Sequence, residues 1–293
     1  MILLLSVDLD PGLAALRPLG AFSVLPTSPH ASPPTSPHAS PPTSPHASPP
    51  TSPHASPHTS PHASPHTSPL PPPGLPTLAQ AYTQEYGDVT PGVHVQVRAD
   101  PLALRVQKVA AALRAPEARV AASVAHQGLA ARLWSVTLGC AALYGGVPDL
   151  APPLLRWDPD ATAPDDLWLA EVRALPGDAA TIAEVVLQGH LVPLAAVLHA
   201  RHRVATGLLW GNAASALAGA GRELDGWARR HGRTDIADRA RSLTAGLLAH
   251  PLLAGTGTLT GTAFRRRSCC LYYRVPAGGV CGDCCFSRPP GSA

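Results

Sequence analysis

The chain has 293 residues, of which 45% are hydrophobic and only 14% are charged, and its formal net charge is +3. So small a charge gives no basis for nucleic-acid binding, which needs a strongly positive surface. We also predict no membrane span, because the uncharged stretch at residues 133–148 contains three glycines and is shorter than the roughly 20 apolar residues that a spanning helix requires.

The first segment, residues 1–25, starts with five apolar residues but has no basic residue before them, and Asp8 and Asp10 end the apolar run. A secretory signal has a different pattern, so we expect a cytoplasmic protein. Residues 20–25 alternate weakly between apolar and polar or small side chains. We expect them to form a short strand that belongs to the folded domain.

Residues 26–76 form a low-complexity tract in which an octapeptide, Thr-Ser-Pro-His-Ala-Ser-Pro followed by Pro or His, starts at Thr27 and recurs four more times. The tract has no charged residue apart from histidine and few groups to bury, so it is predicted to be a disordered, polyproline-biased coil inserted as a loop. Seven of the fourteen histidines lie in it. Repeated imidazoles can bind divalent metal ions, but expansion of a tandem repeat in a surface loop explains them without a function.

Residues 77–254 are predicted to form a mainly helical domain, because Ala, Leu and Val recur at intervals of three and four. The expected helices are residues 101–114, 116–143, 179–203, 207–231 and 235–250. Two short apolar runs, residues 154–157 and 167–172, flank a turn-rich segment and favour a small β-hairpin. The predicted fold class is therefore mainly α with a small β element (α+β).

The last segment, residues 255–293, is a cysteine-rich module in which a Gly/Thr-rich connection leads into five of the six cysteines. In a reducing compartment such a cluster indicates metal or redox chemistry rather than disulfides. Four thiolates suit a [2Fe-2S] cluster, a [4Fe-4S] cluster or a structural zinc, and the candidate ligands are Cys269, Cys270, Cys281 and Cys284. Adjacent cysteines on an extended backbone point to opposite sides, which favours a cluster over a single ion.

The residues between the two cysteine pairs, 271–279, are predicted to form a short strand followed by a Pro-x-Gly-Gly turn. Cys140 stands apart in an apolar helix, where a buried structural role is the usual one for a free cysteine. Cys285 directly follows Cys284, so which of these two is the fourth ligand stays open.

The run from Arg266 to Cys284, with its spacing C-C-x10-C-x2-C, resembles the C-terminal signature of the FhuF-type ferric-siderophore reductases. Residues 209–217, which include Trp210, Gly211 and Asn212, are similar to a second segment of that family. The resemblance implies a [2Fe-2S] cluster on Cys269, Cys270, Cys281 and Cys284 and cytoplasmic one-electron reduction of ferric siderophores. An electron donor such as a ferredoxin or a reductase is then expected as a partner.

Three further sets of residues follow from this hypothesis. Arg266, Arg267 and Arg274 are expected to stabilise the added negative charge of a reduced cluster. Trp210 and Asn212 are candidates for contact with the chelate, although small residues along a helix more often allow another helix to pack closely than a ligand to bind. No nucleophile–base pair was found, so catalytic residues beyond the cluster stay unassigned. A zinc-stabilised binding module and an iron–sulfur sensor or assembly protein are the alternatives.

Overall fold

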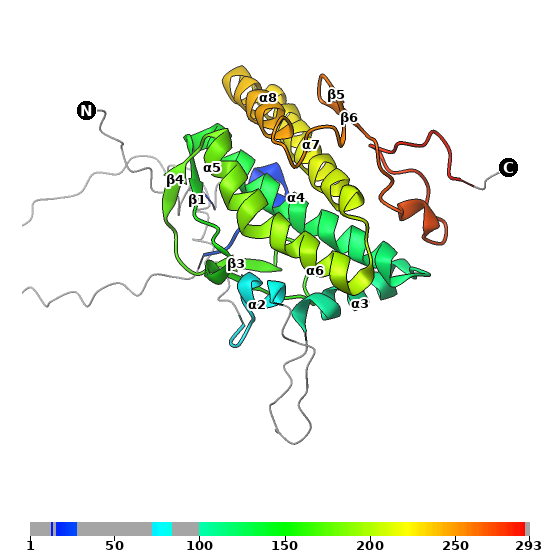
Figure 1. Ribbon diagram of the computed structural model, residues 1–293. Coiled ribbons are helices and arrows are strands. Elements are labelled where there is room, and N and C mark those ends of the chain that lie inside the picture. Colours follow the sequence, from blue (N-terminus) through cyan, green and yellow to red (C-terminus); the bar gives the residue numbers. More distant parts are fainter. Residues whose placement is uncertain (1–12, 14–15, 28–71, 84–99, 291–293) are drawn as a thin grey trace, which may run out of the picture.

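The structure, a computed structural model, describes residues 13, 16–27, 72–83 and 100–290. At its centre lies helix α4 (Ala118–Tyr144), which packs against α3 (Pro101–Leu113), α7 (Thr206–Arg230) and α8 (Thr234–Leu248) (Figure 1). The described residues also contain three two-stranded antiparallel sheets. A mainly helical fold with a small β element is thus confirmed, whereas most of the repeat tract lies outside the described residues.

Helix α4 is the core helix of the domain, since small and branched apolar residues occur on all its sides and most of them are buried. Helix α3 begins at Pro101, as predicted, and the Asp100 side chain caps it by accepting a hydrogen bond from the Leu102 N–H at 2.9 Å. Helix α4 begins at Ala118 rather than at Pro116. The predicted helices at residues 207–231 and 235–250 correspond to α7 and α8.

The helix predicted for residues 179–203 is a continuous helical run of three pieces: α5 (Ala179–Ala183), the π-helical η4 (Glu184–Leu191) and α6 (Val192–His202). Pro193 accounts for the π-helical turn, because proline has no N–H to give to the carbonyl four residues earlier and its ring crowds that carbonyl. Of the described helices, this run alone is long and apolar enough to cross a membrane. Since 56% of its most apolar window is buried inside the domain, it has the character of a core helix.

The predicted hairpin is confirmed as β2 (Leu155–Trp157) paired with β3 (Leu167–Leu169), preceded by the 3-10 turn η3 (Pro152–Leu154). Two further pairs were not predicted. One joins β1 (Gly146–Pro148) to β4 (Ala174–Pro176), and the other joins β5 (Gly257–Thr260) to β6 (Ala263–Arg266). Glycine and proline in these strands weaken the alternating apolar pattern by which a strand is recognised.

The strand expected at residues 20–25 is wrong. The chain forms two 3-10 turns there, η1 (Arg17–Leu19) and η2 (Ala21–Ser23), with Gly20 between them at a φ of 108°. Arg132 of α4 holds the second turn by donating to the Phe22 carbonyl at 2.7 Å, and it also pairs with the buried Asp166 at 2.9 Å. The segment nevertheless belongs to the folded domain, because Leu16 and Leu25 are buried in the core.

Both ends of the repeat tract are fixed to the β2–β3 hairpin. On one edge the Pro26 carbonyl accepts from the Leu169 N–H, and on the other the Pro76 carbonyl accepts from the Trp157 N–H, each at 2.9 Å. Thr77 then begins helix α2 (Leu78–Tyr82) with a capping box. The segment at Pro26, β3, β2 and the segment at Pro76 therefore lie side by side in that order. Since neighbouring strands are about 4.8 Å apart, the three gaps between these segments place the two ends of the tract roughly 14 Å from each other.

Removal of the tract should therefore leave the domain folded. We expect a protein in which an eight-residue Gly/Ser linker replaces residues 28–71 to unfold within about 3 °C of the full chain, because the linker spans roughly 14 Å easily and every core residue that the structure describes is kept. Thermal unfolding followed by circular dichroism measures this. A fall of more than about 10 °C would show that the tract contributes to the fold.

Candidate metal centre

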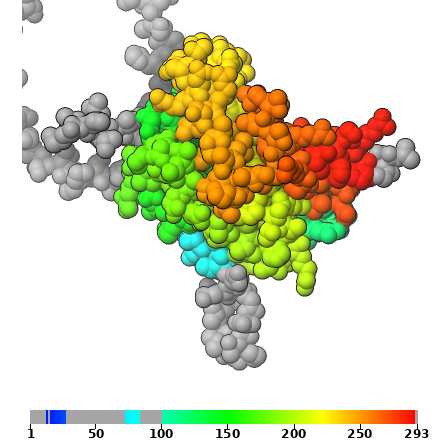
Figure 2. All heavy atoms as spheres, turned by 45° about the horizontal axis from the view of Figure 1, so that its top comes forward, coloured from blue at the N-terminus to red at the C-terminus, as the bar shows by residue number. Residues whose placement is uncertain are grey.

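The candidate ligands lie in a module that covers one side of α7 and the first half of α4 (Figure 1). The module starts with the β5–β6 hairpin, and Figure 2 shows it as a continuous orange-to-red surface beside α8. After β6 the chain continues through both cysteine pairs and returns to β6, where the Arg266 N–H donates to the Asp283 carbonyl at 2.9 Å. This return brings the second cysteine pair next to the first.

The strand expected after Cys270 is wrong, although the return of the chain was predicted. Leu271 adopts a left-handed conformation with a φ of 69°, and Tyr272–Arg274 form the 3-10 turn η5. Gly278 comes so close to the turn that a side chain there would lie 2.5 Å from the Tyr272 carbonyl oxygen. A compact double turn thus replaces the strand and keeps the loop between the cysteine pairs short.

The sulfurs of Cys270 and Cys281 are 3.5 Å apart. Two thiolates bound to one tetrahedral metal at about 2.3 Å lie about 3.8 Å apart, so this pair is spaced to share one metal centre. The pKa of Cys270 is lowered to about 6, first by its hydrogen bond with Cys281, against the opposing effect of burial, and then by the Tyr272 N–H and the Arg266 charge. The hydrogen bond with Cys270 and burial raise the pKa of Cys281.

The other two candidate sulfurs accept backbone hydrogen bonds. The Leu271 N–H points at the Cys269 sulfur at 3.3 Å, and the Phe286 N–H points at the Cys284 sulfur at 3.4 Å. Burial raises the pKa of Cys269 to about 11, and the nearby Cys270, Cys285 and Cys284 add to that rise. Donors of this kind stabilise thiolates that ligate a cluster. Gly279 and Gly282, in the same loop, are exposed and have no atom within 4 Å of an added Cβ.

Within the described ranges, no three His, Cys, Asp or Glu side chains come close enough together to hold a single metal ion. Cys270 and Cys281 instead form one close pair, and Cys269 lies near enough to Cys270, Cys284 and Cys285 for them to raise its pKa. A two-iron cluster takes two thiolates on each iron, so this donor set suits it better than a zinc ion with four converging ligands. Cys140 is fully buried in α4, where burial raises its pKa to about 12, as expected for a structural cysteine.

Asn212 is not placed to contact a substrate. It is completely buried, and its amide group donates to the carbonyl and the hydroxyl of Ser123, both at 2.9 Å. Its amide oxygen accepts a hydrogen bond from Arg266, and the Ser123 hydroxyl in turn donates to the Cys270 carbonyl at 2.8 Å. Asn212 thus joins α7 and α4 to the cysteine module.

The three candidate arginines occupy different environments. Arg266 is only 2% exposed, and its charge acts on Cys270, Cys281 and Cys285. Arg267 is exposed, and Arg274 forms a surface ion pair with Glu117 of the segment before α4. Of the three, Arg266 alone combines burial with closeness to the thiols.

The small residues of α7 serve close packing, and part of that packing is with the module. A Cβ on Gly211 would lie 2.3 Å from the Ser268 hydroxyl, and one on Gly221 would lie 2.3 Å from the Thr244 hydroxyl of α8. Trp210 is half-buried and packs against the core. The packing alternative therefore accounts for this helix, with the cysteine module as one of its partners.

Sequence reasoning did not single out Ser123 and His126, which lie one turn apart on α4 and face the module. His126 is buried, and neither ring nitrogen has a hydrogen-bond partner among the described residues. Burial and then the charge of Arg266 lower its pKa to about 3, so the ring is neutral. Two polar residues in an otherwise apolar stretch of helix were the available signal.

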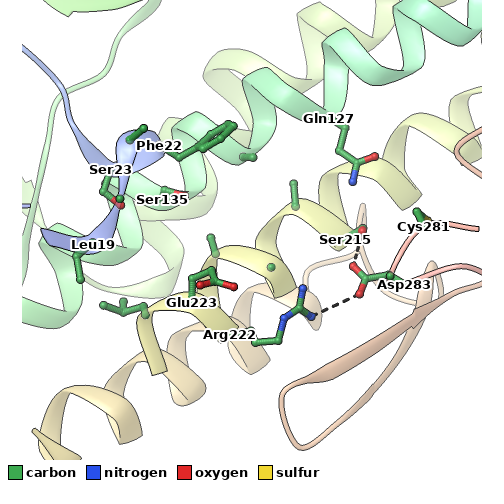
Figure 3. A pocket seen from close by; sticks show the side chains of 18 residues that line it. Leu19, Phe22, Ser23, Gln127, Ser135, Ser215, Arg222, Glu223, Cys281 and Asp283 are labelled. Carbon is green, nitrogen blue, oxygen red and sulfur yellow. Dashed lines mark hydrogen bonds and ion pairs between the residues drawn. The ribbon is translucent and has the colours of Figure 1, made fainter. Parts of the chain in front are cut away.

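A cavity of about 370 Å³ opens beside Cys281, between the η1–η2 turns, α4, α7 and the cysteine module (Figure 3). Gln127 projects into it from α4, and Arg222 and Glu223 line it from α7 (Figure 3). Asp283 stands at its edge, where it accepts from the Ser215 hydroxyl at 2.6 Å and pairs with Arg222 at 3.4 Å. Of the candidate ligands, Cys281 therefore lines a solvent-open hollow.

Comparison with known proteins bears on the cysteine module. Residues 266–286 match the family described as FhuF 2Fe-2S C-terminal domain, and the matched segment contains all four candidate ligands. The cofactor of this segment is accordingly a [2Fe-2S] cluster, for which the four thiols and their backbone donors provide a fitting donor set. No curated protein matches the chain. The close thiol pair and the folded-back loop thus lie in a segment, residues 266–286, that is similar to the FhuF 2Fe-2S C-terminal domain.

Proposed function

We propose that this protein is a cytoplasmic oxidoreductase that releases iron from ferric siderophores by one-electron reduction. The observation that carries the proposal is the match of residues 266–286 to the FhuF 2Fe-2S C-terminal domain, in a structure where two of the four cysteines line an open cavity. FhuF-type proteins are, by the resemblance described above, ferric-siderophore reductases.

In this proposal Cys269, Cys270, Cys281 and Cys284 hold the cluster, which supplies electrons one at a time when bound. The chain contributes three things to that chemistry. The double turn at residues 271–278 keeps the two cysteine pairs together, backbone N–H groups donate to the sulfurs, and Arg266 places a buried positive charge beside Cys270 and Cys281. All three favour a site that accepts added negative charge.

The overall reaction needs only an electron. A reduced donor such as a ferredoxin or a reductase is oxidised by one electron, and the chelated iron goes from iron(III) to iron(II). Siderophores bind iron(III) through hard oxygen donors and hold the less charged iron(II) far more weakly, so the metal becomes labile. No bond of the ligand breaks, which agrees with the lack of a nucleophile–base pair in the sequence.

Stopped-flow mixing tests this function directly. Protein reduced anaerobically and mixed with a ferric trihydroxamate should return to its oxidised spectrum within seconds, because the chelate accepts its electron and iron(II) is trapped by a strong iron(II) chelator present in excess. The iron(II) formed should equal the protein oxidised. Protein that stays reduced for minutes beside the chelate would contradict the reductase proposal and favour a sensor or assembly role, and a colourless protein containing zinc would favour a binding module.

A further inference from the structure

Two hollows beside the cysteine module join into one groove. The cavity described above shares Phe22, Gln127, Ala131 and Cys281 with a second hollow of about 370 Å³. The second hollow adds Cys270 and Tyr272 to the lining. We call the combined space the thiol groove. It lies beside α4, with Tyr272 of the cysteine module at one end and Glu223 of α7 at the other. Its size lies within the range of about 300–1,000 Å³ that is typical of small-molecule sites.

The groove reaches one side of the thiol set. Its lining includes Cys270 and Cys281, the pair 3.5 Å apart, and does not include Cys269 or Cys284. A molecule in the groove therefore lies on the side of the thiol set where a cluster bound to Cys270 and Cys281 would be reached. Close approach of the partners is the main requirement for a reaction in which only an electron moves.

The charges along the groove sum to −1, from Arg222 (+1), Glu223 (−1) and Asp283 (−1). Arg222 and Asp283 are paired with each other, which leaves Glu223 as the carboxylate whose charge is not balanced in the groove lining. Gln127 and Ser135 add uncharged hydrogen-bonding groups. Such a lining disfavours an anionic guest and accepts a neutral or cationic one.

We propose that the thiol groove is the docking site of the ferric chelate and that Glu223 selects chelates without net negative charge. This inference rests on the proposed function and adds a location and a selectivity to it. The Gln127 amide is positioned to donate to oxygen atoms of the chelate, and Phe22, which is 46% exposed, provides an apolar wall. Neutral or cationic trihydroxamate complexes fit these conditions, whereas trianionic tris-catecholate complexes do not.

Filling the groove tests its location. Gly219 lines the groove on α7, and the only atom near an added Cβ is the end of the Arg222 side chain at 3.9 Å. Gly219→Leu should therefore fold well, since leucine is also the better helix former by nearly 1 kcal/mol. Gly226→Leu on the same helix is the matched control, because Gly226 is outside the groove lining and its nearest neighbour is the flexible end of Arg230.

The readout is equilibrium binding of a gallium(III) trihydroxamate to oxidised, cluster-loaded protein by titration calorimetry, because this complex cannot be reduced. We expect Gly219→Leu to weaken binding at least tenfold and Gly226→Leu to change it less than twofold, with the visible spectrum of the cluster unchanged in both. Equal affinity of both variants, or no binding to the unaltered protein, would overturn the groove as the docking site.

Charge reversal tests the selectivity. We expect Glu223→Lys to raise the affinity for a gallium(III) tris-catecholate about tenfold while changing the affinity for the neutral complex less than threefold. Glu184→Lys, at an exposed position on η4 outside the groove, is the control and should change neither. A rise in Glu184→Lys equal to that in Glu223→Lys would show that total charge, not the groove, sets the preference.

Stopped-flow reduction by the same variants separates this inference from the proposed function. If the unaltered protein and Gly219→Leu reduce the ferric complex at equal rates, the protein is a reductase but the groove is not its docking site. If the unaltered protein binds the gallium chelate in the groove but does not reduce the ferric complex, the reductase proposal is contradicted and the groove is a binding site only.

Discussion

Replacement of Cys270 or Cys281 by serine should abolish the [2Fe-2S] cluster. The two sulfurs are 3.5 Å apart, close enough to bind one metal centre together, so a serine hydroxyl at either place removes a thiolate from the site. We expect iron and acid-labile sulfide to fall below about a tenth of the level in the unaltered protein, with loss of the visible absorption. Cys269→Ser should have the same effect.

Cys140→Ser is the control, because Cys140 is buried in α4 away from the module. A serine hydroxyl can bond to a carbonyl one turn earlier in the helix, so the cost to folding is modest. Full cluster content in Cys270→Ser would contradict the ligand assignment. Cluster loss in Cys285→Ser but not in Cys284→Ser would move the fourth ligand by one residue.

Arg266→Gln should lower the reduction potential of the cluster by several tens of millivolts. Reduction adds one negative charge, a buried cation next to Cys270 and Cys281 favours the reduced form, and removing the cation therefore shifts the potential downward. For one electron, 59 mV corresponds to about 1.4 kcal/mol, which is a reasonable size for a charge shielded from water. Glutamine keeps a donor for Asn212, so the local fold should persist.

Arg267→Gln and Arg274→Gln are matched controls that remove the same charge from solvent-exposed or surface-paired positions. Screening by water and salt should limit each of their shifts to about 10 mV or less. Protein film voltammetry measures all three variants, and Arg266→Lys should recover most of the potential because it restores the charge. Equal shifts in the three variants, or no recovery with lysine, would show that buried charge does not set the potential.

The sequence alone names the four candidate ligands, but it does not reveal their surroundings. Four cysteines at a family-specific spacing can be recognised as candidate metal ligands, because thiolates in that number have few other uses in a reducing compartment. The contacts of Asn212 with Ser123, and of Arg266 with Asn212, join residues 54 to 89 positions apart in the chain. No local pattern carries that information. The sequence therefore offers Asn212 as a polar group for a substrate, with helix packing as the alternative, whereas its hydrogen bonds are internal.

The same distinction holds for the fold. The long helices could be predicted because periodicity is a local property, and the starts at Pro101 and Asp235 differ from the observed ones by at most one residue. The β5–β6 hairpin is rich in glycine and threonine, and it depends on packing against α7 rather than on its own side-chain pattern. Residues 20–25 turn instead of extending because Arg132, more than a hundred residues later, binds their carbonyls.

The anchoring of Pro26 and Pro76 on one hairpin has a consequence for the gene. Slippage of the replication machinery on a repeated DNA sequence adds or removes whole octapeptide units and keeps the reading frame. The folded domain contacts the flanks of the tract, at Leu169 and Trp157, and these contacts are the same for any number of units. Because each doubling of a loop costs only about 0.6 kcal/mol in closure entropy, selection on folding hardly opposes such changes. Copy number can therefore drift between closely related lineages while the cysteine module stays the same.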